Sequence, residues 1–81
     1  MTIRLMLFAH LQDLFGSPDA FVELPAHATV HDLANLMQQK DMRLAGLTNY
    51  ARVAVNSQWA KTDHELCDGD EVAFIPPSSG G

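Results

Sequence analysis

The chain has 81 residues, with ten Asp and Glu against five Lys and Arg and a formal net charge of −5. This length fits a single domain, and an apolar content of 47% is typical of a folded protein rather than a disordered one. An acidic chain without a basic stripe argues against binding to nucleic acid or to an anionic membrane. No apolar stretch approaches the ~20 residues of a membrane-spanning helix.

The first segment, residues 2–9, predicts a strand. Every second residue is apolar there, and the residues between them include further apolar ones, so this strand is expected either to be central in a sheet or to be covered by another part of the protein. The apolar residues of these two faces are Ile3, Leu5 and Leu7 on one and Met6 and Phe8 on the other. A short helix is predicted over residues 10–15, followed by a turn and a second strand over 20–24.

The main helix is predicted over residues 30–39. Thr29 and Asp32 have the spacing of a capping box, although Asp is shorter than the usual Glu at that position. An apolar stripe of helical period follows, made of Val30, Leu33, Leu36 and Met37. Residues 41–50 fit either a helical extension or a packed loop. We expect the apolar residues of this stretch to lie in the core: Met42, Leu44 and Leu47.

The C-terminal half predicts three more strands, over residues 52–55, 58–60 and 71–75. Asn56 and Ser57 suit a turn between the first two, and one helical turn is expected within residues 62–67. The last strand is expected to pair in parallel with the first. This order predicts an α+β fold in which a mixed sheet packs on one main helix, within a domain spanning residues 1–77.

The chain ends in F-I-P-P-S-S-G-G, so a strand runs into two prolines and then into a tail without apolar side chains. Proline cannot continue a strand ladder, and Pro76 and Pro77 are expected to lead the tail away from the body in extended geometry. Residues 78–81 are therefore predicted to form a flexible tail. Gly80 and Gly81 have no Cβ, so this end can enter a channel that excludes larger residues.

The remaining candidate sites carry weaker signals. Cys67 is the single cysteine, which excludes an internal disulfide and suits a reducing compartment such as the cytoplasm. It could act as a sulfur relay or a redox thiol, but we expect a plain, partly buried thiol because no CxxC partner is present. The four histidines match no zinc motif, and no metal site is expected.

A docking patch is expected near the root of the tail. Phe74 and Ile75 are consecutive on the last strand, so one of them faces the helix and the other faces the opposite side of the sheet. Phe8 on the first strand and Trp59 near the edge are expected to extend that opposite side into a partner-binding surface, with core packing as the alternative for Trp59 and Phe74. Pro76 and Pro77, at the root of the tail, are also expected to contact the partner.

Several segments together resemble a known family. These are L-F-A-H-L-Q-D-L-F-G at 7–16, V-A-V-N at 53–56, D-G-D-E-V-A-F-I-P-P at 68–77 and the final S-S-G-G. The set is similar to the small sulfur-carrying subunits of molybdopterin synthase, which are ubiquitin-like sulfur carriers. The resemblance implies a ubiquitin-like β-grasp fold. One departure is Gln12-Asp13, where family members often carry a basic residue in the short helix.

The resemblance also implies a chemistry for the terminus. An ATP-dependent activating enzyme would convert the Gly81 carboxylate to an acyl-adenylate, and sulfur would then replace AMP to give a thiocarboxylate. The tail would enter the large subunit of the synthase and give its sulfur to a pterin precursor. The chain would not be catalytic alone, and ATP would be used by the activating enzyme rather than held as a cofactor. Two alternatives stay open: a sulfur carrier for thiazole synthesis, or a ubiquitin-like modifier joined to lysines.

Overall fold

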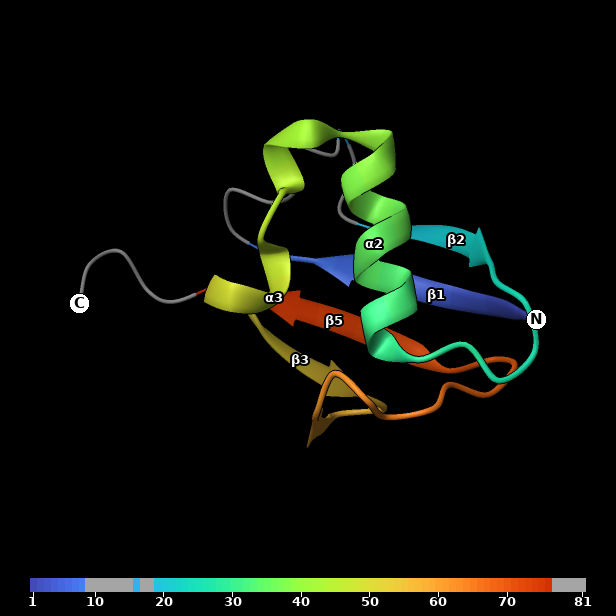
Figure 1. Cartoon of the computed structure of the whole chain (residues 1–81). Coiled ribbons are helices and arrows are strands. Elements are labelled where there is room, and N and C mark those ends of the chain that lie inside the picture. The colour runs from blue at the N-terminus through green and yellow to red at the C-terminus, as the bar shows by residue number, and fades with distance from the viewer. Residues whose placement is uncertain (9–15, 17–18, 77–81) are drawn as a thin grey trace.

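The computed structural model describes residues 1–8, 16 and 19–76, and it arranges them as one sheet with helices on one side (Figure 1). The elements in chain order are β1 (Thr2–Leu7), β2 (Asp19–Glu23), α2 (Val30–Lys40), the short 3-10 helix η1 (Met42–Leu44), α3 (Leu47–Tyr50), β3 (Arg52–Val55), β4 (Gln58–Ala60) and β5 (Glu71–Ile75). The strands predicted at 52–55, 58–60 and 71–75 are confirmed. The helix predicted at 10–15 lies outside the described residues.

The sheet has the strand order β2-β1-β5-β3-β4. The last strand, β5, lies in the middle, parallel to β1 and antiparallel to β3. The parallel pairing of the first and last strands and the mixed sheet on one main helix are therefore confirmed. This arrangement is the β-grasp fold that the resemblance implies.

The main helix α2 begins with the expected capping box. The backbone N–H of Asp32 donates to Oγ1 of Thr29 at 3.2 Å, and the backbone N–H of Thr29 donates to Oδ2 of Asp32 at 2.9 Å. Two N–H groups that a helix start leaves without intrahelical partners are thus satisfied, and the shorter Asp side chain is long enough for the reciprocal bond. The helix ends at Lys40, one residue beyond the predicted end.

The core lies between α2 and the face of the sheet that α2 covers. Its largest fully buried side chains are Phe74, Ile3, Leu5, Leu7, Leu33, Met37, Leu44, Leu47, Val30 and Val72. The expectation of a core position is confirmed for Leu44 and Leu47 but is wrong for Met42, whose side chain is 86% exposed. Met42 starts the single turn of η1, and that turn directs Leu44 rather than Met42 inward.

The helical turn expected within residues 62–67 is also wrong. This segment instead runs along the start of α2 and supplies acceptors to it. The carbonyl oxygens of Thr62 and His64 accept from the N–H groups of His31 and Val30, at 2.9 and 3.0 Å. These are donors that the first helical turn cannot satisfy internally. The segment makes a single tight turn at Thr62 and Asp63, in which the N–H of His64 donates to the carbonyl oxygen of Lys61 at 3.1 Å, and it contains no helix.

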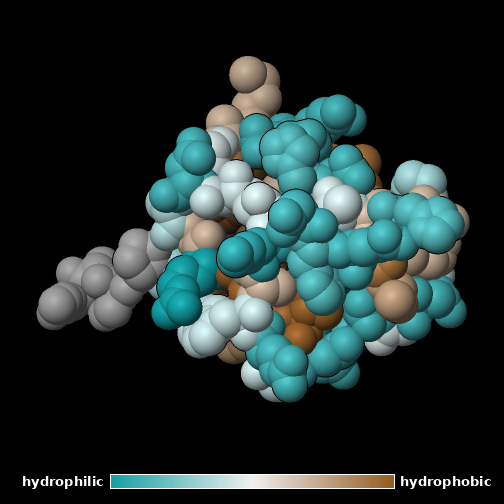
Figure 2. Space-filling model, turned by 60° about the horizontal axis from the view of Figure 1, so that its bottom comes forward, coloured by the Kyte–Doolittle hydropathy of each residue, from teal (hydrophilic) through white to brown (hydrophobic). Residues whose placement is uncertain are grey.

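The surface turned toward the viewer in Figure 2 is mostly hydrophilic, with smaller apolar areas between the polar side chains. Within the part of the chain that the structure describes, no helix is long and apolar enough to cross a membrane. Among the same residues, no three His, Cys, Asp or Glu side chains are placed to hold a metal ion. Cys67 is exposed, so the expectation of a partly buried thiol is wrong. Its position between the buried Leu66 and the turn at Gly69 leaves the thiol at the surface.

Candidate docking face

The two faces of β5 differ sharply at its end. Phe74 is fully buried on the side of α2, where it lies opposite Val53 of β3. Ile75 projects to the other side and is half-buried. The expectation that Phe74 belongs to a partner-binding surface is therefore not met, because its side chain is part of the core. Of the two neighbours, Ile75 is the one that a partner can contact.

The side of the sheet opposite α2 is called here the open face. Strand register places a row of small and apolar side chains across it. Trp59 of β4 lies opposite Ala54 of β3, Ala54 lies opposite Ala73 of β5, and Ala73 lies beside Met6 of β1. The two alanines in the centre leave room between the larger side chains on either side. The open face is consequently hollow in its middle.

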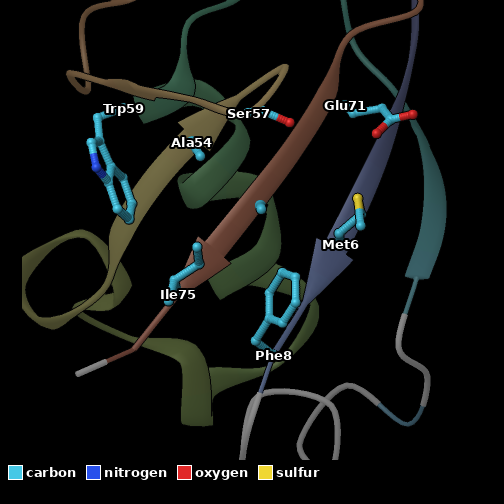
Figure 3. A pocket seen from close by; sticks show the side chains of 8 residues that line it. Met6, Phe8, Ala54, Ser57, Trp59, Glu71 and Ile75 are labelled. Atoms are coloured by element: carbon cyan, nitrogen blue, oxygen red, sulfur yellow. The ribbon is translucent and has the colours of Figure 1, made fainter. Parts of the chain in front are cut away.

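This hollow has a volume of about 330 Å³ and is lined by Met6, Phe8, Ala54, Ser57, Trp59, Glu71, Ala73 and Ile75. Figure 3 views it from the open face: Phe8 and Ile75 lie near the end of β5, while Trp59 borders the hollow from β4. Phe8 is 40% and Trp59 is 56% exposed, although both are large and apolar. Apolar surface gathered around a hollow is a common feature of interaction sites. The structure thus brings together three of the side chains predicted for docking, Phe8, Trp59 and Ile75.

Arg52 is a further residue of the open face, and it was not among the residues predicted from the sequence. The guanidinium carbon of Arg52 lies 3.8 Å from the centroid of the Trp59 ring. Arg52 is opposite Ile75 in the β3–β5 ladder, and it is diagonal to Trp59 across the β3–β4 hairpin. Diagonal neighbours on one sheet face are within reach of long and aromatic side chains. The two-residue turn at Asn56 and Ser57 contained the signal, since it fixes the register of the hairpin and therefore this diagonal.

The other end of the open face is charged but internally neutralised. Arg4 of β1 lies between Asp19 and Glu71, at N···O distances of 3.0 and 3.7 Å. Phe21 of the edge strand β2 is opposite Arg4 and 77% exposed, and the sequence reasoning had not selected it. The apolar part of the open face is therefore bounded by an ion-pair cluster on the β2 side.

The root of the tail joins this face. β5 ends at Ile75, whose side chain lines the hollow, and Pro76 follows directly and is buried. A buried proline fixes where the chain leaves the sheet, and it offers less surface to a partner than was expected of it. The expectations for Pro77, Gly80 and Gly81 concern residues outside those that the structure describes.

In the part of the chain that the structure describes, β1 and β5 form a central parallel pair, α2 crosses the sheet, and the open face adjoins the start of the segment that carries the diglycine. These features define a ubiquitin-like β-grasp carrier or modifier protein. The chain belongs to the ThiS family, whose model matches residues 5–81. That match reaches the terminal glycine, so it includes the tail as well as the sheet.

Three known proteins illustrate the similarity. The chain is 37% identical to the molybdopterin synthase sulfur carrier subunit of Escherichia coli over 81 residues, which cover 98% of this chain and 99% of that one. It is 25% identical to small archaeal modifier protein 1 of Haloferax volcanii, with a TM-score of 0.84 and coverage of 95% and 98%. It also resembles a chain in the complex of subunits 1 and 2 of the molybdopterin-converting factor from Helicobacter pylori, with a TM-score of 0.70, 20% identity and full coverage of both chains; at that identity the likeness concerns the fold.

Proposed function

We propose that this protein is a sulfur carrier of molybdenum cofactor biosynthesis and the small subunit of a molybdopterin synthase. The observation that carries the proposal is the similarity to the E. coli sulfur carrier subunit along almost the entire length of both chains. The family match through Gly81 and an open face beside the tail exit add support.

The chemistry starts from the Gly81 carboxylate, which is ionised at neutral pH and is a poor electrophile. In the proposed first step, a carboxylate oxygen attacks the α-phosphorus of ATP on an activating enzyme, and pyrophosphate leaves. Hydrosulfide then attacks the acyl carbon, AMP leaves with the oxygen, and the S–H proton is lost to water. The product is a Gly81 thiocarboxylate, which differs from the starting chain by one sulfur in place of one oxygen.

The second half of the proposed cycle takes place on the large synthase subunit. The tail inserts there, and the thiocarboxylate gives its sulfur to a pterin precursor, which contributes to the dithiolene that binds molybdenum. The absence of side chains at Gly80 and Gly81 suits a narrow entry path. The chain supplies the sulfur while the large subunit supplies the acceptor site, so neither acts alone. We place this cycle in the cytoplasm.

We further propose that the open face holds the large subunit while the tail is inserted. The tail is too short to provide lasting affinity, since ordering it costs conformational entropy. Phe8, Trp59 and Ile75 surround the hollow and are the natural anchors. Ile75 is one residue from Pro76, so a partner bound to it is already at the start of the tail.

A reconstitution with purified components tests the proposal. The chain is incubated with ATP, a sulfur source and the activating enzyme, and its intact mass is measured. A gain equal to one sulfur for one oxygen at the terminus is expected. The sulfurated chain is then mixed with the large subunit and the pterin precursor, and formation of the dithiolene product is followed. A sulfurated chain that forms no complex with the large subunit would contradict the assignment to this synthase and favour a carrier of another pathway, such as thiazole synthesis.

Protein modification is the second candidate, favoured by the likeness to small archaeal modifier protein 1. Both functions need an adenylated terminus, but they differ in the nucleophile that attacks it. A lysine amine would give an isopeptide bond. Because Lys61 is the last Lys or Arg of the chain, trypsin would leave residues 62–81 as a remnant on the modified lysines of other proteins. Finding such remnants in cells that express the chain, and losing them when the chain is deleted, would establish this function.

A further inference from the structure

Some of the positively charged side chains of the chain form ion pairs and others do not. All five Lys and Arg lie within the described residues, and two of them are neutralised there: Arg4 by Asp19 and Glu71, and Arg43 by Asp41. Among the described residues, Lys40, Arg52 and Lys61 form no ion pair. Lys40 is at the end of α2, on the helix side of the sheet. The other two lie together at the opposite edge.

Arg52 and Lys61 line the same hollow beside β4, with Trp59 between them in sequence. These three residues are called here the cationic edge. Arg52 is exposed and lies on the Trp59 ring, and no described residue accepts a hydrogen bond from its guanidinium. A guanidinium has five N–H donors, and stacking on a ring leaves those donors free at its rim. The indole therefore orients Arg52 without using its hydrogen-bonding capacity.

Trp59 also lines the hollow of the open face, and Arg52 is opposite Ile75 in the ladder. A partner that covers the hollow consequently comes close to the Arg52 guanidinium. Removing an unpaired charge from water is costly, whereas a charge that meets a bidentate carboxylate at an interface can be retained there. A partner that binds the open face thus needs an acceptor at this position.

We propose that the cationic edge is the specificity contact of the docking face, where Arg52, oriented by Trp59 and accompanied by Lys61, binds a carboxylate side chain of the large synthase subunit. This inference rests on the proposed function and adds the chemistry of the partner surface. The rest of the chain is acidic, so two cations without a counter-charge at one edge give the encounter a preferred orientation. The apolar anchors supply the affinity, and the cationic edge fixes the orientation in which the two proteins dock.

The test measures binding of the full chain to the purified large subunit by titration calorimetry at low and at high salt. Arg52→Glu is expected to weaken binding by about tenfold or more at low salt, because it places two carboxylates against each other. Arg52→Gln is expected to weaken binding less and to reduce its salt dependence. Lys40→Glu is the matched control, since it changes the net charge equally on the helix side, and it is expected to leave the dissociation constant within about twofold.

A double-mutant cycle tests the part played by Trp59. Trp59→Leu keeps an apolar side chain but removes the ring face, so Arg52 loses its orientation. The effect of Arg52→Gln is therefore expected to be smaller in the Trp59→Leu background than in the wild type. Equal effects in both backgrounds would show that the ring does not position Arg52. Melting temperatures of all variants show whether each change is confined to binding.

The outcomes separate this inference from the proposed function. If the wild-type chain does not bind the large subunit, the synthase assignment fails and the inference fails with it. If the wild type binds and Arg52→Glu binds equally well, or if Lys40→Glu weakens binding as much as Arg52→Glu does, the inference alone is overturned. A charge exchange, in which a Lys replaces an acidic residue of the large subunit and restores binding to Arg52→Glu, would identify the carboxylate.

Discussion

Phe74 and Ile75 are consecutive in β5 and project to opposite faces of the sheet, so that one is fully buried under α2 and the other lines the hollow of the open face. Phe74 therefore contributes to the stability of the domain, whereas Ile75 is available to a binding partner. The same strand holds the domain together with one side and presents its surface with the other. This makes the pair a natural place to test the docking face.

Ile75→Asp is expected to weaken binding of the large subunit by roughly 2 kcal/mol or more, the scale of an interface hot spot, and to change stability little. Phe74→Ala is expected to lower the free energy of unfolding by about 3–5 kcal/mol, because it empties a core position. Calorimetric binding and denaturant unfolding of both variants check this. Two variants that unfold the domain alike, or that both leave binding unchanged, would place the docking face elsewhere.

The length of the terminus offers a second test. Deleting Gly81 shifts the reactive carbon by about 3.3–3.6 Å, one extended residue. Adding a residue after Gly81 turns its carboxyl group into a peptide bond. A misplacement of ~1 Å can already cost a hundredfold in rate, so both variants are expected to give no detectable sulfur transfer. Their melting curves should match the wild type, since neither change touches the sheet. Full activity in either variant would exclude the proposed mechanism.

The capping box of α2 predicts a stability effect. Thr29→Ala removes the acceptor for the Asp32 N–H and is expected to lower the free energy of unfolding by about 1 kcal/mol. Thr62→Ala, an exposed threonine outside the helix, is the control and should stay within about 0.5 kcal/mol of the wild type. Urea denaturation of both variants measures the difference. A similar loss in both would assign the effect to threonine in general rather than to the cap.

Asp41 and Arg43 give a prediction about pH. A side-chain hydrogen bond from Arg43 lowers the pKa of Asp41 below its ordinary value, helped by the Arg43 backbone N–H and opposed by desolvation. Because the folded-state pKa is lower than the unfolded one, the pair stabilises the fold above the unfolded pKa, and this stabilisation is lost as the pH falls through the folded pKa. Arg43→Gln removes the charged donor and should raise the pKa of Asp41 in an NMR titration. An unchanged titration midpoint would show that the pair does not form in solution.

Much of the fold follows from local patterns in the sequence. The strand at 52–55 ends at the turn of Asn56 and Ser57, and the strand at 71–75 ends before Pro76. The spacing of Thr29 and Asp32 marks the start of α2. Local patterns do not predict that Met42 is exposed. Met42 and Leu44 are equally apolar, and only the packing of η1 against α2 decides which one enters the core.

The docking face was predictable in part. Alternation along β5 required that one of Phe74 and Ile75 face away from the helix, but which one did so depended on the placement of α2. The stacking of Arg52 on Trp59 depends on the pairing of β3 with β4. That pairing is local, since the two-residue turn at Asn56 and Ser57 joins the strands, but the contact becomes evident only once the register of the hairpin is known.

The central position of β5 has a consequence for how the domain is made. Among the described strands, β5 follows the other four in the chain, and it joins the β1–β2 pair to the β3–β4 pair. Without β5, these four strands form two pairs with no ladder between them. Isolated hairpins are at best marginally stable in water. Translation must therefore reach Ile75 before the domain can close, and a chain interrupted earlier has no assembled docking face to offer.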